Sequence, residues 1–261
     1  MKPATTGINP FNDGLDRLQE GDLEGAVAEF TRAIRRDPGH ALAYLNRGLA
    51  RRKLGDLPLA IADFDRALQI HPKLADAHLH RGLAWKKKGD AARGLADFEK
   101  AIQLNPRLAE AFVQRGSLRQ KQGDEAGALA DFEQAIQLNP LGKEAYNYRG
   151  LARMAKGDLA EAVADFEQVL QIDSHYVQAY YNRGLVRQKQ GKLASAIDDF
   201  NQAISLNSHL AEAYANRGLA LLQTGREVEA ELDFHQFFRR KPAKRLELEK
   251  RIREVRRQLY R

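Results

Sequence analysis

The chain has 261 residues, of which 43% are apolar and 30% are charged, so it carries enough apolar surface to fold. It contains no cysteine, which excludes disulfide bonds, thiolate metal sites and a cysteine nucleophile. Residues 1–11 lack the apolar core of a signal peptide, and no segment approaches the roughly 18 apolar residues of a membrane span, so we expect a soluble cytoplasmic protein.

The net charge of +7 is concentrated at the carboxyl-terminal end of the chain. Residues 239–261 hold eleven Lys and Arg side chains against three Glu, a charge of +8. Residues 1–238 hold 31 basic and 32 acidic side chains and are nearly neutral at −1. The basic character of the chain therefore belongs to one segment.

Glycine and phenylalanine recur with a period of 34 residues. Two glycine series, seven residues apart, contain fourteen of the 20 glycines: Gly14, Gly48, Gly82, Gly116, Gly150, Gly184 and Gly218, and Gly21, Gly55, Gly89, Gly123, Gly157, Gly191 and Gly225. Phenylalanine follows at Phe30, Phe64, Phe98, Phe132, Phe166, Phe200 and Phe234. A period of this length is typical of repeat architectures, in which each unit buries its apolar face against its neighbours.

Each repeat predicts two helices separated by a turn. Seven repeats follow one another: 7–40, 41–74, 75–108, 109–142, 143–176, 177–210 and 211–244. In the second repeat, residues 41–54 keep helical spacing up to the turn at Gly55-Asp56, and residues 57–70 form another helical stripe before Pro72. The glycine at position 8 of each repeat is costly within a helix. We therefore expect it to mark a close approach of the two helices, facing the alanine at position 20.

The residues that recur at fixed positions of these repeats resemble the tetratricopeptide repeat, a 34-residue motif with an aromatic residue, Leu-Gly, Ala, Phe and Pro at fixed positions. The resemblance covers residues 7–244 and implies an all-α fold, a right-handed α-α superhelical solenoid of seven helix-turn-helix repeats with a concave inner face. The departures are local: Pro10 and His78 at position 4, Ser174 and Ser208 at position 32, and Arg in place of Leu at position 7 in six repeats.

Both ends of the array carry their own signals. Asn9-Pro10 fits a helix N-cap followed by proline at the first helical position. Residues 245–261 predict a basic amphipathic capping helix, because four apolar residues follow one another at spacings of 4, 3 and 4: Leu248, Ile252, Val255 and Leu259. A solenoid needs such a cap to cover its last apolar interface.

A ladder of opposite charges runs through the repeats. Position 7 is Arg in six repeats, and position 23 is acidic in all seven. Pairing within each repeat would set Asp13 against Glu29 in the first, whereas pairing each acid with the Arg 18 residues later avoids that repulsion and leads from Asp233 to Arg251. On this hypothesis the tail helix docks in the place of an eighth first helix. An Arg stripe that reads phosphates is the less favoured alternative, because each Arg has a matched acid.

No pattern indicates catalysis. The histidines have no recurring acid at metal-ligand spacing, and His78 and His80 point to different sides of a helix. Gly191-Lys192 lacks the first glycine and the hydroxyl residue of a phosphate-binding loop. We therefore expect a non-enzymatic protein with no cofactor, no metal and no small-molecule substrate.

The resemblance implies a binding surface on the first helix of each repeat, at positions 2, 5, 6, 9, 12 and 13. In this chain those positions combine leucines, amides and cations, chiefly in the first four repeats. The candidate peptide-binding residues are Leu45, Asn46, Leu49, Arg52, Lys53, Leu79, Leu83, Lys86, Lys87, Gln114, Lys121 and Asn182. An apolar floor beside amides and cations suits an acidic, partly apolar segment. The alternative is that the leucines pack between helices and the lysines are only solvated.

We therefore expect a scaffold or adaptor that binds a peptide or protein partner, whose identity the sequence does not give, in the concave groove. A rival hypothesis assigns the function to the basic tail, where four arginines would meet nucleic acid or an anionic membrane: Arg253, Arg256, Arg257 and Arg261. The carboxylate clamp with which members of the resembled family grip chaperone termini is mostly missing, because position 5 is never Lys and position 9 is mostly Leu.

Overall fold

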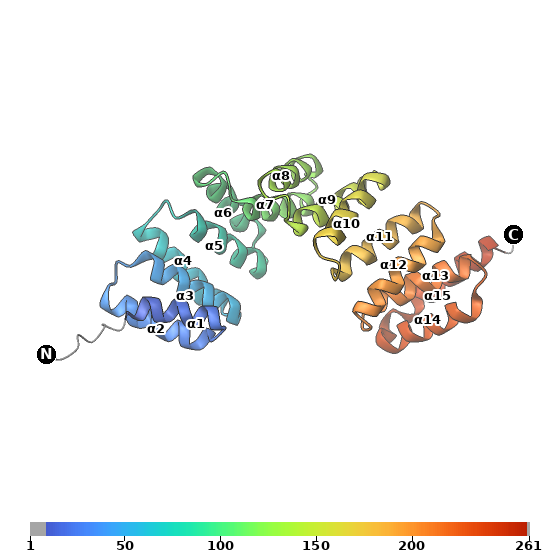
Figure 1. Ribbon diagram of the computed structural model, residues 1–261, viewed down its shortest axis with the longest axis horizontal. Coiled ribbons are helices and arrows are strands. Elements are labelled where there is room, and N and C mark those ends of the chain that lie inside the picture. Colours follow the sequence, from blue (N-terminus) through green and yellow to red (C-terminus); the bar gives the residue numbers. More distant parts are fainter. Residues whose placement is uncertain (1–8, 260–261) are drawn as a thin grey trace. The chain divides into compact units, whose positions relative to one another are not determined.

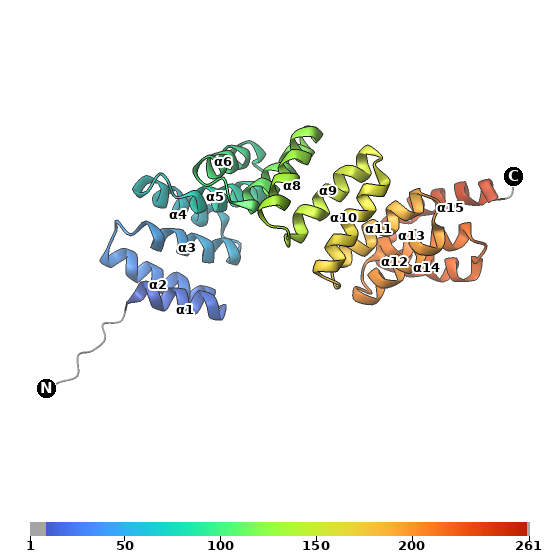
Figure 2. The same ribbon diagram turned by 45° about the horizontal axis from the view of Figure 1, so that its top comes forward.

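The computed structural model describes residues 9–259, which form fifteen α-helices and one short 3₁₀ helix, with no strand in that range (Figure 1). The helices form consecutive hairpins, and the two helices of each hairpin lie side by side (Figure 2). The predicted all-α class and the tandem helix-turn-helix repeats are confirmed. None of the described helices is long and apolar enough to cross a membrane.

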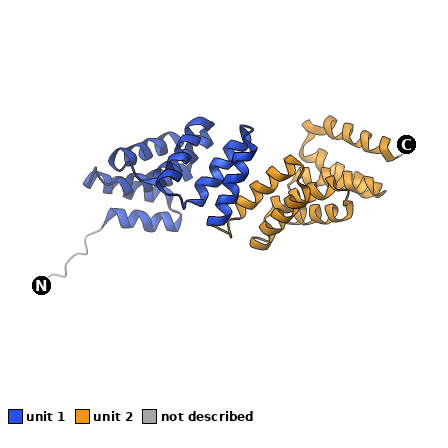
Figure 3. Cartoon of the chain, turned by 90° about the horizontal axis from the view of Figure 1, so that it is seen from above, with its two compact units in different colours: residues 1–138 blue, residues 139–261 orange. Residues whose placement is uncertain are grey.

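The chain divides into two compact units, residues 1–138 and residues 139–261 (Figure 3). The first unit contains α1 (Pro10–Glu20), α2 (Leu23–Arg36), α3 (Ala41–Leu54), α4 (Leu57–Ile70), α5 (Ala75–Lys88), α6 (Ala91–Leu104), α7 (Ala109–Lys121) and α8 (Glu125–Leu138). The second contains α9 (Lys143–Lys156), α10 (Leu159–Ile172), α11 (Val177–Lys189), α12 (Leu193–Leu206), α13 (Ala211–Gln223), α14 (Glu227–Arg240), the 3₁₀ helix η1 (Pro242–Lys244) and α15 (Arg245–Leu259).

The turn inside each repeat is made by glycine. Gly55, between α3 and α4, has a φ of 89°, a left-handed conformation that glycine adopts without steric cost and that ends the helix. The carboxylate of Asp56 then caps α4 by accepting a hydrogen bond from the backbone N–H of Leu59 at 3.2 Å. At the start of the array, Asn9 caps α1 as predicted, accepting from the backbone N–H of Phe11 at 3.1 Å.

The two helices of a repeat approach closely at the position-8 glycine, as predicted. A Cβ atom added to Gly48 would lie 2.6 Å from Cε1 of Phe64, a fully buried ring. The nearest neighbour is thus the phenylalanine at position 24. Position 20 also faces the glycine, since a Cβ on Gly94 would lie 3.2 Å from the carbonyl oxygen of Gly82. The 34-residue glycine period therefore reflects the space that a phenyl ring needs.

The charge ladder forms inside single repeats, from the second repeat to the seventh, so the predicted pairing with the following repeat is wrong. The position-7 Arg lies 2.6–2.7 Å from the position-23 carboxylate 16 residues later in six pairs: Arg47–Asp63, Arg81–Asp97, Arg115–Asp131, Arg149–Asp165, Arg183–Asp199 and Arg217–Asp233. In the first repeat, Glu29 avoids the expected repulsion by turning to Arg32 on its own helix, at 2.9 Å. The second oxygen of Glu29 is buried without a hydrogen bond.

Three of these arginines, Arg47, Arg81 and Arg217, also donate a hydrogen bond to the residue at position 25 of the preceding repeat. Nη1 of Arg81 donates to Oδ1 of Asp65 at 2.6 Å, and Nη1 of Arg217 donates to Oδ1 of Asn201 at 2.7 Å. One guanidinium therefore joins the two helices of its repeat and also the second helix of the repeat before it.

The predicted capping helix is present as α15, which packs on α13. Leu248 and Ile252 are 2% and 7% exposed in a cluster that includes Leu219 and Phe237, whereas Leu259, at the end of the predicted seam, is 43% exposed. The tail docks without the expected bond to Asp233, which pairs with Arg217.

Arg251 instead donates from Nη2 to Oδ1 of Asn216 at 3.0 Å. Burial of apolar side chains, assisted by this amide contact, therefore holds the cap. Arg261, one of the tail arginines named by the rival hypothesis, lies outside the described residues.

Candidate functional site

Side chains from α3, α5 and α7 meet on one surface of the first unit, which we name the A-face and define by Arg52, His80, Lys86, Gln114, Ser117 and Lys121. Nζ of Lys86 donates to Oε1 of Gln114 at 2.7 Å and to Oγ of Ser117 at 2.5 Å. Arg52 lies close enough to His80 for its charge to act on the imidazole. Positions 6, 9, 12 and 13 of adjacent repeats therefore share a surface, as the resemblance implies.

Arg52 is a half-buried cation with no carboxylate bonded to it among the described residues. Its Nε atom is buried and has no hydrogen bond. Burial lowers the pKa of the guanidinium, and the charge of Glu110 only partly opposes that shift. Every ladder arginine, by contrast, is bonded to a buried Asp.

His80 is held neutral beside Arg52. Burial, and then the charge of Arg52, lower the pKa of the imidazole from 6.5 to about 4. Its Nδ1 atom is buried without a hydrogen bond. The ring thus offers a polar atom that nothing else in the described chain uses.

Lys86 has only neutral acceptors. Burial, and then repulsion by Lys121, lower the pKa of its ammonium group to about 8. Gln114 and Ser117 satisfy two of its three donors without compensating its charge. The A-face therefore gathers positive charge in a partly desolvated setting, an arrangement that favours binding of a carboxylate.

The predicted leucines divide into two groups. Leu45 and Leu79, at position 5, are 6% and 3% exposed and belong to the hydrophobic core, so they lie beneath the surface. Leu49 and Leu83, at position 9, are partly buried and pack on the same clusters while keeping some surface. The apolar part of the candidate site is therefore narrower than the sequence predicts.

The remaining candidates are exposed to solvent or bonded to groups near them. Lys53, Lys87 and Lys121 are exposed, and the amide of Asn46 donates to the carbonyl oxygen of Leu42 in its own helix at 2.8 Å. Asn182 belongs to the second unit, where it is 8% exposed and its Nδ2 lies 3.4 Å from Oδ1 of Asn147. The structure therefore brings Arg52, Lys86, Gln114 and Lys121 together and gives Asn182 a local partner.

His80 and Ser117 belong to the A-face but are missing from the predicted set. Position 6 carries an amide in five repeats, so the histidine at this position of the third repeat is the signal that could have identified it. His78, two residues earlier, serves the ladder, because its Nδ1 lies 3.0 Å from Oδ1 of Asp97. Among residues 9–259, no three His, Asp or Glu side chains are grouped as metal ligands.

The helix hairpins, their glycine turns and the buried ladder define an α-helical repeat protein. Family models described as tetratricopeptide repeat or TPR repeat match residues 11–75, 75–108, 109–140, 150–191 and 177–210. The chain belongs to the tetratricopeptide repeat family. A comparison with curated proteins finds no match.

Solved structures of repeat proteins share the fold. The Cut9–Hcn1 hetero-tetramer of the APC/C matches 96% of the chain with a TM-score of 0.77 and 17% identity, and this chain spans about half (49%) of that one. YrrB, described as a TPR protein with an unusual peptide-binding site, is 26% identical over 70% of this chain and 95% of its own, with a TM-score of 0.57. A tetratricopeptide repeat protein from Parabacteroides merdae ATCC 43184 is 23% identical over 87% of this chain and 90% of its own, with a TM-score of 0.67.

Proposed function

We propose that the chain is a non-enzymatic interaction scaffold whose A-face binds an acidic segment of a partner polypeptide. The observation that carries the proposal is the pair Arg52 and Lys86, two half-buried cations that no described carboxylate bonds. Membership of the tetratricopeptide repeat family supports a role in protein interaction, and the peptide-binding site of YrrB supports a peptide as the ligand.

A carboxylate on the A-face would compensate charges that the protein leaves unpaired. It would accept from the partly exposed guanidinium of Arg52 and from the ammonium of Lys86, and charge-assisted bonds of this kind are the stronger class of hydrogen bond. Bonds made in a partly desolvated site are also screened less by salt than those at an open surface.

An apolar contact adjoins each of these cations. Leu49 lies three residues before Arg52 on α3, and Leu83 lies three residues before Lys86 on α5, so each pair shares a helix face. A segment that alternates acidic and aliphatic side chains would therefore place carboxylates on the cations and aliphatic groups on the leucines. The cytoplasmic location, and association of the tail with nucleic acid or an anionic membrane, remain predictions from the sequence.

Fluorescence anisotropy with labelled synthetic peptides tests the proposal. We expect a peptide of alternating Glu and Leu to bind the full chain, and one of alternating Lys and Leu not to bind. Arg52→Gln combined with Lys86→Gln should lower the affinity for the acidic peptide about tenfold or more, since each lost charge-assisted bond contributes roughly 1–2 kcal/mol.

Lys73→Gln serves as the matched control, because Lys73 is exposed in the loop before α5 and has no ion pair among the described residues. Equal affinities of the wild-type protein and the double variant for the acidic peptide would refute the proposal.

A further inference from the structure

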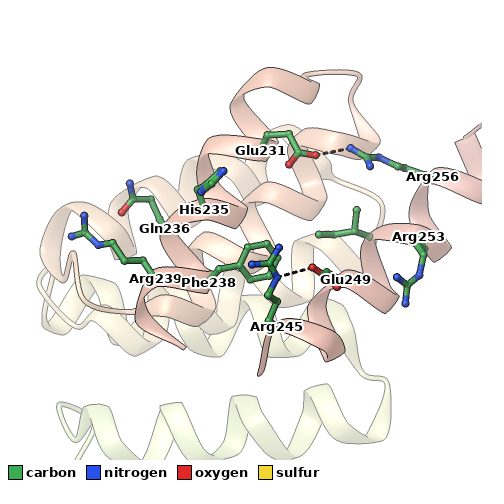
Figure 4. Close-up of a pocket in the computed structure, with 10 residues that line it drawn as sticks. Glu231, His235, Gln236, Phe238, Arg239, Arg245, Glu249, Arg253 and Arg256 are labelled. Atoms are coloured by element: carbon green, nitrogen blue, oxygen red, sulfur yellow. Dashed lines mark hydrogen bonds and ion pairs between the residues drawn. The ribbon is translucent and has the colours of Figure 1, made fainter. Parts of the chain in front are cut away.

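A pocket lies between α14 and α15 (Figure 4). Of these two helices, α15 packs chiefly on α13. The pocket has a volume of about 740 Å³, within the usual size of binding sites. Its charged and titratable side chains come from both helices: Glu231, His235 and Arg239 from α14, and Arg245, Glu249, Arg253 and Arg256 from α15. Arg245 is ion-paired with Glu249 at 2.8 Å. Arg256 reaches across to Glu231 at 2.5 Å, whereas Arg239 and Arg253 form no ion pair among the described residues.

The α14 side of this pocket corresponds to a joint that is filled elsewhere in the array. Positions 21 and 25 of a second helix receive positions 7 and 11 of the next first helix. In the second unit, Nη1 of Arg217 on α13 donates to Oδ1 of Asn201 on α12 at 2.7 Å, and Ile197 and Leu221 lie beside this pair. The corresponding residues of α14 are Glu231 and His235.

The last repeat departs from the pattern at both of these positions. Position 21 is aliphatic in the first six repeats and Glu231 in the last: Val27, Ile61, Leu95, Leu129, Val163 and Ile197 precede it. Position 25 is acidic or neutral in the first six and His235 in the last: Thr31, Asp65, Glu99, Glu133, Glu167 and Asn201 precede it. On the surface of α14 that corresponds to this joint, position 21 is therefore acidic instead of aliphatic, and position 25 is basic instead of acidic or neutral.

The first repeat departs in the complementary sense. Position 7, which is Arg in the other six repeats, is Asp13. The carboxylate of Asp13 forms no ion pair among residues 9–259, and Asp16 and Glu20 are exposed on the same helix. Position 11 is Arg17, as Arg is in four other repeats; it is opposite in charge to Glu231 and is ion-paired with Asp22 in its own copy at 2.5 Å. The position-7 and position-25 members of the joint therefore differ at the two ends of the array, with an acid in place of Arg at position 7 and a basic residue in place of an acidic or neutral one at position 25.

The wider charges agree with this exchange. Residues 9–30 hold six acidic side chains and one basic side chain, a charge of −5. Residues 239–259 hold ten basic and three acidic side chains, a charge of +7. Opposite fields of this kind steer two copies toward one another in a fixed orientation.

We propose that the pocket between α14 and α15 is the docking site for α1 of a second copy of this chain. Asp13 of one copy would face His235 and Arg239 of the other, and Arg17 would face Glu231. The two surfaces differ, so the contact is heterologous: each bound copy leaves one acidic end and one basic end free for another.

Sedimentation velocity of the full chain at low and high salt tests the proposal. We expect concentration-dependent association that salt weakens, because the contacts are largely between exposed charges. Asp13→Arg with Asp16→Arg should abolish it, and so should His235→Glu with Arg239→Glu. These changes are compatible with the fold, since six repeats carry Arg at position 7 and three carry Glu at position 25, and since Asp16 and Arg239 are exposed.

The chain that carries all four substitutions should associate again, because the reversed charges once more face each other. Asp198→Arg is the control, since Asp198 is exposed on α12 and has no ion pair among the described residues. A wild-type protein that stays monomeric would overturn the proposal, as would association that persists in either double variant. Failure of the fourfold variant to associate would also overturn it, and would leave the basic pocket to a different anionic ligand, such as a nucleic acid.

Discussion

Asp165 joins two arginines of the preceding helix. Its Oδ1 lies 2.7 Å from Nη2 of Arg149, and its Oδ2 lies 2.8 Å from Nη1 of Arg153, one turn further along α9. The carboxylate is 2% exposed, so both oxygens are satisfied by groups of the same repeat. In this repeat the ladder thus joins the first helix to the second.

Removal of this acceptor should destabilise the second unit. Asp165→Ala leaves two partly buried guanidinium groups without their acceptor, and we expect a loss of about 2–4 kcal/mol in the free energy of unfolding. Glu161→Ala, an exposed change on the same helix, should stay within about 0.5 kcal/mol of the wild type. Urea unfolding followed by circular dichroism measures both. Similar midpoints for the two variants would show that the ladder adds no stability.

The capping helix α15 contains a buried leucine and an exposed leucine whose effects on stability can be compared. Leu248→Ala should cost about 2–4 kcal/mol because Leu248 is 2% exposed and fills the cluster against α13. Leu246→Ala, two residues earlier and 78% exposed, should change the unfolding free energy by less than about 0.5 kcal/mol. The same denaturation experiment distinguishes them, and equal effects would mean that α15 does not dock as described.

The close packing at the position-8 glycine predicts whether replacing it with alanine stabilises or destabilises the protein. In an open helix, Gly→Ala stabilises by up to about 1 kcal/mol. At Gly48 the added methyl group would lie 2.6 Å from the ring of Phe64, so Gly48→Ala should instead destabilise by about 1–3 kcal/mol. Thermal unfolding measures the effect, and a raised melting temperature would contradict the close packing.

The fold follows from the sequence because the period is local. Glycine at the turns and phenylalanine at the hairpin contact recur every 34 residues, so the helix bounds 41–54 and 57–70 could be predicted to the residue. The pairing of charges in the ladder could not be predicted in this way. The signs of the charges allow partners 16 or 18 residues apart, and only the first repeat favoured one spacing over the other. In that repeat, Glu29 pairs with Arg32 on its own helix, which removes the reason for the choice.

The candidate site was only partly predictable for a related reason. Arg52 and Lys86 stand out by type and position, but burial depends on how neighbouring first helices stack. Leu45 and Leu79 pass into the core through that stacking, and His80 becomes an unpaired polar group beside Arg52. A repeat pattern predicts which side chains share a face of each helix, but it does not predict how deeply each of them is buried.

His80 should make stability depend on pH. Its pKa is about 4 in the folded state against an ordinary 6.5, so between these values the unfolded chain binds a proton that the folded chain does not. The unfolding free energy therefore falls as the pH falls through this window. Between pH 7 and 4.5, the wild type should lose on the order of 1–2 kcal/mol more than His80→Gln. Urea midpoints at the two pH values test this, and parallel losses would contradict the buried neutral imidazole.

The most direct test of the A-face is the titration of Lys86 itself. With ¹³C-labelled lysine, the Cε resonance of Lys86, assigned by its absence in Lys86→Gln, reports the pKa of its ammonium group. The free protein should titrate near pH 8, below the usual 10.5. A saturating peptide of alternating Glu and Leu should raise the pKa of Lys86 by at least about one unit, since a nearby carboxylate favours the charged form. A pKa of Lys86 that is unchanged while the peptide is bound would contradict carboxylate recognition at this surface.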